Sequence, residues 1–409
     1  MPRASARLTV VVAILVTGCS RVPEATWTLR ADAEKLDLPA KHARQIADSL
    51  EYFHGTPATP RMFLPAEDGA EPDKTPAADA VQATPISIAR VDKPGYDRMR
   101  LQYGHAVYTK QCAACHGTTG DGKGPAGAHL NPPPRDYRNG VFKFTSTPRG
   151  SKPRREDLRR ILKYGAKGTS MPAFRFLSEE DAEAIIDYVQ VLSARGELEI
   201  DLIREATDEL DEGDDFDPAA VAGYVTKIAD SWDRAESELV RPLTVNPPRT
   251  PETIHAGAVA FGELYCVKCH GPDARGSKSA DVGQDIWGRT AYPANLAMGM
   301  LHGGRRPIDI YRRIYSGING TPMPASKDPN TAIGETPEQR SDRIWHLVHF
   351  VTDIIERNEV PEDAREAIEE VLRKQAAPPP PAAEEPAKAA DATGGGTPLA
   401  AAAPVGAVP

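Results

Sequence analysis

The sequence Cys112-Ala-Ala-Cys115-His116 returns later in the chain as Cys266-Val-Lys-Cys269-His270. Each copy is followed by a second matched block, which reads GAKGTSMPA over residues 165–173 and GINGTPMPA over residues 317–325. Because both blocks recur in the same order within 409 residues, the sequence predicts an internal duplication.

Each copy follows one plan, over residues 96–195 and 254–357. A helix leads into the cysteine motif and is followed by a Gly/Pro-rich loop, a short helix, a Met-Pro turn and a closing helix. The first closing helix has Ser178 as a predicted N-cap, with acidic residues in its first turn. All long periodic segments have a helical period and none alternates like a strand, so we predict an all-α protein of two tandem small bundles.

The residue types in the motif indicate its chemistry. Two thiols at this spacing can add across the two vinyl groups of one haem, which carries the next residue beneath the iron. We therefore predict two haem c groups. The covalent attachments are Cys112, Cys115, Cys266 and Cys269, and the proximal iron ligands are His116 and His270. A redox dithiol or half of a zinc site shares the C-x-x-C spacing, but the adjoining His and Gly favour haem.

Met171 and Met323 are the predicted sixth ligands of the two irons. Both lie in a Gly-Thr-x-Met-Pro context, although the chain has only seven methionines. A thioether opposite an imidazole is typical of electron-transfer haem, and the proline restricts the loop. The alternative is that either Met only fills the core.

Other side chains could also supply the sixth iron ligand, but they do not repeat in both copies. Met298 and Met300 lack the Gly-Thr-x-Met-Pro context, and six histidines have no counterpart in the other copy: His105, His129, His255, His302, His346 and His349.

The loop after His116 is rich in glycine, which allows the backbone to lie close to a haem edge. A proline carbonyl in this region is expected to accept a hydrogen bond from the second imidazole nitrogen and so to orient the ring. We assign this role to Pro125. The second copy lacks the glycine string, so its haem environment is expected to differ.

The N-terminus has the pattern of an export signal. Arg3 and Arg7 precede an apolar run of nine residues, LTVVVAILV over 8–16, which is too short to span a bilayer. The following Val-Thr-Gly-Cys19 resembles a bacterial lipoprotein box. The resemblance implies a signal peptide over 1–18, lipidation of Cys19 and a periplasmic-side protein anchored to a membrane. An ordinary secretory signal is the alternative.

The remaining segments lie outside the two copies. Residues 19–95 are predicted to hold the anchor, a helix over 39–54 and an extended linker over 56–94 that spaces the domains from the membrane. Residues 197–250 form a connector with helices near 202–210 and 219–239. A helical extension over 359–375 and a disordered Ala/Pro-rich tail over 376–409 follow the second domain.

Charge is unevenly distributed around a net value of −9. Residues 100–175 contain about fifteen Lys or Arg and four acids, whereas 197–217 contain eleven acids and one Arg. Such runs are often solvated faces. Alternatively, the basic region attracts an acidic redox partner or folds against the acidic stretch.

With these motifs together, the chain resembles two fused class I cytochrome c domains, over residues 96–196 and 251–358. The resemblance implies one haem per domain, His/Met ligation and one-electron transfer rather than catalysis. The expected donor is a quinol-oxidising complex and the expected acceptor a terminal oxidase or reductase, with no nucleic-acid partner. A haem subunit of a respiratory complex and a di-haem peroxidase are the alternatives.

Overall fold

The computed structural model describes residues 27–30, 38–62, 97–276, 282–328, 330 and 334–376. Within these ranges the regular structure is helical, with two isolated β-bridges, so the all-α prediction is confirmed for this part of the chain. The predicted signal peptide, Cys19, most of the 56–94 linker and nearly all of the tail lie outside the described residues. None of the described helices is long and apolar enough to cross a membrane.

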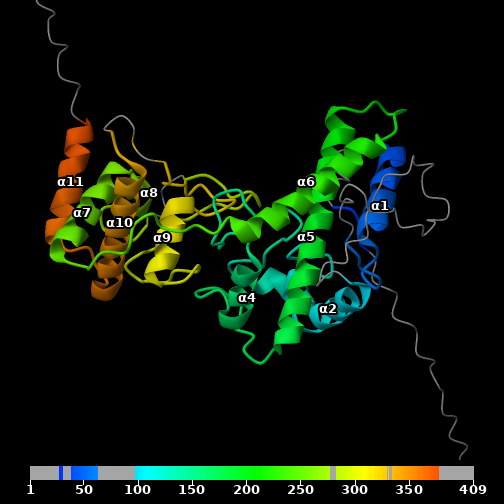
Figure 1. Cartoon of the computed structure of the whole chain (residues 1–409), viewed down its shortest axis with the longest axis horizontal. Helices are drawn as coiled ribbons and strands as arrows, with labels where there is room; N and C mark the ends of the chain where they lie inside the picture. The colour runs from blue at the N-terminus through cyan, green and yellow to red at the C-terminus, as the bar shows by residue number, and fades with distance from the viewer. Residues whose placement is uncertain are drawn as a thin grey trace, which may run out of the picture.

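The helices form two groups with loops between them (Figure 1). The first body consists of α1 (Ala40–His54), α2 (Arg98–Gln111), α3 (Ala113–His116), the 3₁₀ helix η2 (Gly127–His129), α4 (Arg155–Tyr164), α5 (Glu179–Asp208) and α6 (Pro218–Ser237). The second body consists of α7 (Pro251–Glu263), α8 (Cys266–His270), α9 (Pro307–Ser316), α10 (Pro337–Arg357) and α11 (Glu362–Ala376).

α5 is the central helix of the first body. Its N-cap is Ser178, whose side chain accepts a hydrogen bond from the backbone of Asp181, as the sequence predicts. The helix does not end near 195, and the separate helix predicted near 202–210 is its continuation. The interior Gly196 does not break the helix: a methyl group there would overlap Arg138, so the glycine serves a close approach of two backbones.

α1 belongs to the first body and is not part of a spacer. Its apolar face, with Ile46, Leu50 and Phe53, is buried in the same core as Leu198 of α5 and Trp232 of α6. Burying such side chains stabilises the docked helix by about 1.5–3 kcal/mol each. The described part of residues 19–95 is therefore built into the fold.

Part of the acidic stretch folds against this body. Glu197 forms an ion pair with Lys152, and Asp215 forms one with Lys41 of α1 at 2.8 Å. The buried Glu199 accepts a hydrogen bond from the backbone of Arg30 at 2.6 Å. Of these contacts, the Lys152–Glu197 pair joins the basic region 100–175 to the acidic stretch, whereas Lys41 and Arg30 lie outside that region.

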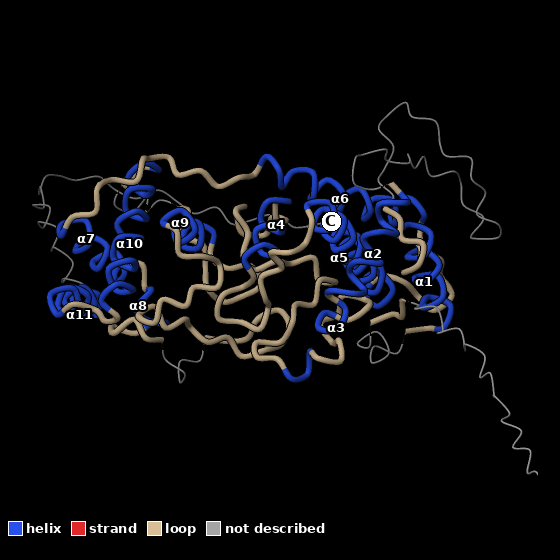
Figure 2. The backbone as a smooth tube through the Cα atoms, turned by 90° about the horizontal axis from the view of Figure 1, so that it is seen from below, coloured by secondary structure: helices blue, strands red, loops and turns tan. Residues whose placement is uncertain are grey.

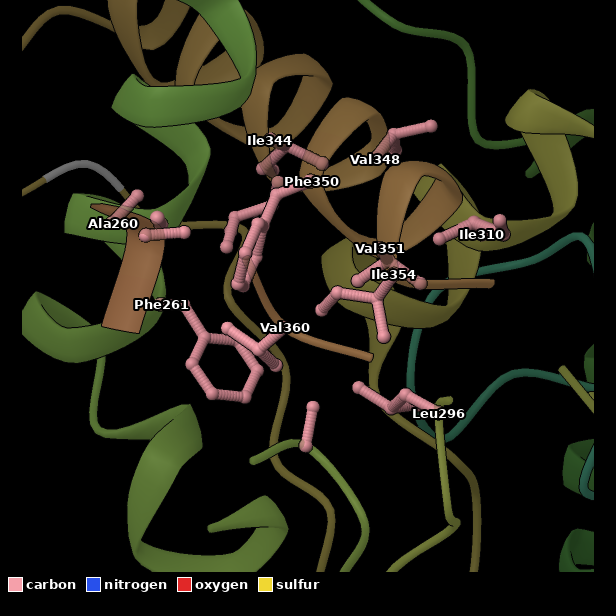
Figure 3. Close-up of a cluster of buried hydrophobic side chains, with 14 of the residues drawn as sticks. Ala260, Phe261, Leu296, Ile310, Ile344, Val348, Phe350, Val351, Ile354 and Val360 are labelled. Atoms are coloured by element: carbon pink, nitrogen blue, oxygen red, sulfur yellow. The ribbon is translucent and has the colours of Figure 1, made fainter. Parts of the chain in front are cut away.

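The second body packs around α7 and α10 (Figure 3). Phe261 of α7 meets Phe350 of α10 edge to face, with ring centroids 5.4 Å apart. Ile310 of α9 closes one side of this core. α11, which occupies the predicted helical extension, packs on α7 and buries Ile368.

In each body a glycine allows two helices to cross closely. A methyl group at Gly104 of α2 would overlap the carbonyl oxygen of Ala184 in α5. A methyl group at Gly257 of α7 would likewise overlap the carbonyl oxygen of His346 in α10. Both glycines precede a cysteine motif, and this further repeat was not predicted from the sequence.

Loop segments lie between α4 and α9 where the bodies meet (Figure 2). The two helices are also joined directly, by an ion pair between Arg160 of α4 and Asp309 of α9 at 2.6 Å. The connecting segment after α6 is tied to both sides: the backbone of Val240 donates to the carbonyl of Ser146 at 2.9 Å, and Trp345 donates to the carbonyl of Thr244 at 3.0 Å.

Replacing the glycines at the helix crossings by alanine is expected to lower stability, which is the reverse of the usual effect of Gly→Ala in a helix. Gly→Ala inside a helix normally stabilises by about 1 kcal/mol. At Gly104 or Gly257 we expect a loss of about 1–3 kcal/mol, because the added methyl forces the helices apart. At Gly223 of α6 an added methyl group would have no heavy atom within 4 Å, so Gly223→Ala is the matched control and should stabilise. Chemical denaturation of the three variants measures the difference, and a stabilised Gly104→Ala would contradict the crossing.

Candidate functional site

Both cysteine motifs form a short helix that ends at the histidine. In the first body Cys112 directly follows α2, and the buried Tyr108 hydroxyl donates to the carbonyl of Gly117 at 2.8 Å. In the second body Tyr265 adopts a left-handed conformation, with φ of 58°, before α8 begins. Gly117 and Gly271 then turn the chain with φ of 77° and 75°, which glycine adopts without strain.

No disulfide bond joins the four cysteines of the motifs to one another. Burial raises the pKa of Cys112 to about 12 and that of Cys266 to about 11. Redox dithiols and zinc sites depend on thiolates, which low pKa values favour.

Each motif histidine is oriented by a backbone carbonyl. His116 Nδ1 lies 3.2 Å from the carbonyl oxygen of Arg135, and His270 Nδ1 lies 3.1 Å from that of Ala294. Burial lowers the pKa of both imidazoles. A neutral ring that donates from Nδ1 presents the lone pair of Nε2, which is the atom that ligates a metal. Tyr137 stacks on His116, with ring centroids 4.7 Å apart.

The prediction that Pro125 orients His116 is wrong. The chain after the motif folds back on the motif helix: Gly124 donates to the carbonyl of Cys115 at 3.1 Å, and Ala126 donates to that of Ala114 at 2.9 Å. These bonds place Pro125 along the motif helix, and the chain reaches the imidazole only when it returns at Arg135.

In the second copy the chain also returns to the motif histidine, although its loop lacks the run of glycines that follows His116. Gly122 donates to the carbonyl of His116, and Gly276 donates to that of His270, at 2.9 and 2.8 Å. A methyl group at either glycine would lie 2.6 Å from a carbonyl oxygen, that of Pro134 or that of Pro293. The residue after each proline supplies the acceptor for the histidine. The proline that both loops share was the feature of the sequence that could have identified these acceptor residues.

The two Met loops have the same internal hydrogen bonds. The carbonyl of Met171 accepts from the backbone of Ala166 at 3.2 Å, and that of Met323 accepts from the backbone of Ile318 at 3.3 Å. In both loops the Thr hydroxyl accepts a hydrogen bond from the backbone N–H of the Met. The same hydroxyl donates to the backbone carbonyl three residues before the Thr, that of Ala166 or Ile318. The glycine that precedes each of these loops has a positive φ, of 69° and 67°.

Several of the other side chains considered as sixth iron ligands contact other residues in the structure. Both ring nitrogens of His349 have partners, Thr253 and Asn246, each at 2.9 Å. His302 contacts the carbonyl oxygen of Lys167, and His105 packs on Tyr188. Met300 lies beside Gly168. These contacts give the four residues packing and bonding roles.

Between the bodies, buried donors suit the carboxylates that a haem carries. Arg135 Nη1 and Trp287 Nε1 are buried without a hydrogen-bond partner among the described residues. The Arg135 guanidinium lies 4.0 Å from the centroid of the Trp287 ring. Orphaned buried donors are costly, so an anionic group fits here, and these two residues together with the motif would hold haem.

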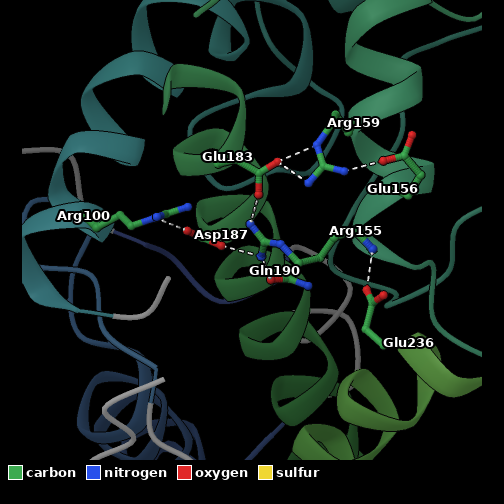
Figure 4. A network of polar contacts seen from close by, with 8 residues as sticks. All are labelled: Arg100, Arg155, Glu156, Arg159, Glu183, Asp187, Gln190 and Glu236. Carbon is green, nitrogen blue, oxygen red and sulfur yellow. Dashed lines mark hydrogen bonds and ion pairs between the residues drawn. The ribbon is translucent and has the colours of Figure 1, made fainter. Parts of the chain in front are cut away.

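A network of ion pairs holds α4, and with it the Met171 loop, against α5 (Figure 4). The Arg155 guanidinium bonds to Asp187 at 2.5 Å and to Glu183 at 2.6 Å. Arg159 also bonds to Glu183, and Arg100 of α2 bonds to Asp187 at 2.6 Å. Asp187 is fully buried, so its charge depends on these arginines.

Part of the first domain matches a known family model. The family model described as "Cytochrome C oxidase, cbb3-type, subunit III" matches residues 100–189, a range that contains the first cysteine motif, Arg135 and the Met171 loop. Residues 100–189 are therefore similar to a cytochrome c domain, a class of domain that carries haem c and transfers electrons.

The other comparisons concern larger parts of the chain. A chain of the "reducing HAO-like protein complex Kustc0457/Kustc0458" of Kuenenia stuttgartiensis has 28% sequence identity and a TM-score of 0.45, over 65% of this chain and 100% of that one. No curated protein matches the chain.

The α4 network predicts how stability depends on pH. Burial raises the pKa of Glu183, but the hydrogen bonds from Arg155 and Arg159 outweigh it and hold the pKa below its ordinary value of 4.5. The pairing therefore stabilises the fold above that pH and is lost as the pH falls through the lower, folded-state value.

We expect Glu183→Gln to be less stable than wild type at neutral pH and to lose less stability on acidification, as measured by urea unfolding across that range. Glu212→Gln, in the exposed loop after α5, is the control and should follow the wild-type curve. Parallel curves for Glu183→Gln and wild type would contradict the assignment.

Proposed function

We propose that the chain is a di-haem c-type cytochrome that transfers single electrons. The observation that carries the proposal is the match between the two sites. Each has a C-x-x-C-H helix, a histidine whose Nδ1 is held by the carbonyl of the residue after a loop proline, and a Gly-Thr-x-Met-Pro loop with the same internal hydrogen bonds. The second body repeats the geometry of the family-matched domain, so a second haem is the simplest interpretation.

The side chains have distinct roles in this proposal. Bound haem supplies a one-electron iron couple. Cys112 and Cys115 hold it by thioether bonds, and His116 presents a neutral Nε2. Met171 would be the second protein ligand of that iron and would leave no open position for a small substrate. Cys266, Cys269, His270 and Met323 have the same roles in the second body.

The setting follows from the same interpretation. We propose a lipid anchor at Cys19 on the periplasmic side of a bacterial membrane, with a quinol-oxidising complex as donor and a terminal oxidase or reductase as acceptor. The family model is named for an oxidase subunit, which supports the variant in which this chain is a permanent haem subunit of a complex. Matched Met loops in both bodies favour electron transfer over a peroxidase.

Haem stoichiometry and spectra test the function. We expect two covalent haems per chain and one after Cys266→Ala with Cys269→Ala, as measured by mass and haem absorbance. Both should be low-spin, and the oxidised protein should show a Met–iron charge-transfer band that decreases by about half in Met171→Ala or Met323→Ala. One haem per chain would disprove the di-haem proposal, and a high-spin haem that reacts with peroxide in native protein would favour the enzyme.

Cys19→Ser tests the anchor separately. The variant should keep both haems but move from the membrane fraction to the soluble periplasmic fraction, because lipid chains are its only proposed attachment. Retention of Cys19→Ser in washed membranes would contradict the lipid anchor and point to a stable protein partner.

A further inference from the structure

The loop that contains Met323 is held by the first body. Arg149, in a turn before α4, donates from Nη1 to the carbonyl oxygen of Met323 at 2.6 Å and from Nη2 to that of Thr321 at 2.8 Å. Nη1 also lies 3.4 Å from the carbonyl oxygen of Ile318. One guanidinium thus reaches three carbonyls of one loop, which its planar fork of donors permits and a lysine ammonium does not.

Asn319 makes a second contact between the same loop and the first body. Its buried amide accepts from the backbone of Gly150 at 2.9 Å and donates to the carbonyl of Phe142 at 3.2 Å. Both partners lie in the first body. Separating the bodies would therefore remove both hydrogen bonds from this amide.

The second body makes the corresponding contact with the Met171 loop. His302, in the segment before α9, contacts the carbonyl oxygen of Lys167, and a methyl group at Gly168 would overlap the side chain of Met300. The segment before each short helix therefore contacts the Met loop of the other body. Such reciprocal contacts are those of two copies docked about a pseudo-twofold axis.

The two Met loops have the same internal hydrogen bonds, but their contacts with the other body differ in chemistry. The Met171 loop receives one imidazole and a thioether side chain, whereas the Met323 loop receives a charged guanidinium on three carbonyls. Charge-assisted hydrogen bonds are the stronger kind. The Met323 loop is thus the one whose order depends more on the other body.

We propose that Arg149 is a positioning residue for the sixth haem ligand of the second body, and that Asn319 assists it. Docking of the first body keeps the Met323 loop ordered, so that the thioether stays on its iron. Without Arg149 the loop regains conformational freedom, which favours the dissociated state. The proposal rests on the di-haem, His/Met assignment made above.

Carbon monoxide binding to the reduced protein tests this proposal, because the gas can bind only after the Met leaves. In Arg149→Ala we expect the rate of binding to one haem per chain to rise about three- to tenfold, since charged hydrogen bonds at an exposed guanidinium are lost. The Met–iron band of that haem should weaken as well. Arg149→Lys should be intermediate, because an ammonium cannot serve all three carbonyls.

Three control variants separate positioning from general loosening. Arg241→Ala removes an exposed arginine from the connecting segment and should leave the rate unchanged. His302→Ala should leave the haem of the second body unchanged. In a Met323→Ala background Arg149→Ala should add nothing, because its effect passes through Met323.

The outcomes distinguish this proposal from the proposed function. If the wild-type protein has two Met–iron bands and Arg149→Ala changes neither the band nor the rate, the role of Arg149 is disproved and the function stands. An equal change at both haems would also overturn it. If the wild-type second haem has no Met–iron band, the His/Met assignment itself fails.

Discussion

The hydrogen bond between the Nδ1 atom of each motif histidine and a backbone carbonyl is the constraint on which both sites depend. It selects the tautomer and fixes the ring plane of His116 and His270. To supply the acceptor, the chain must turn sharply after the motif and return to the imidazole, and in the first body it runs back along the motif helix on the way. Glycines with positive φ allow the first turn, and the contact of Gly122 or Gly276 with a proline carbonyl aligns the return.

Rigid packing keeps that arrangement in place. The helix before each motif crosses the closing helix at a glycine, so the motif has a fixed position against the core. In the first body the arginines of α4 bond to Glu183 and Asp187 of α5, and this fixes the start of the Met171 loop. In the first body, the motif helix with His116 and the Met171 loop are thus both held against α5.

The two bodies meet through polar groups of loops and of helices α4 and α9, which gives their contact a different character from either core. The side chains of Asn319, Ser316 and Asp309 are buried there, and each bonds to the first body. Hydrogen bonds of this kind are directional and fix one docking geometry, whereas apolar surfaces permit sliding. In the di-haem cytochrome that we propose, a docked pair of domains, each contacting the Met loop of the other, would suit the passage of electrons within one molecule.

The sequence alone determined the all-α class, the repeated plan and the motif residues, because helical periodicity and the C-x-x-C-H spacing are local properties. It also marked both Met loops, whose glycines and threonine act within nine residues. Only the tertiary structure decided that Arg135 rather than Pro125 orients His116, that α5 continues through Gly196, that α1 joins the core, and that Arg149 holds the loop of the other body. These features depend on which distant backbones approach one another, and a carbonyl or an arginine carries no local sign of its partner.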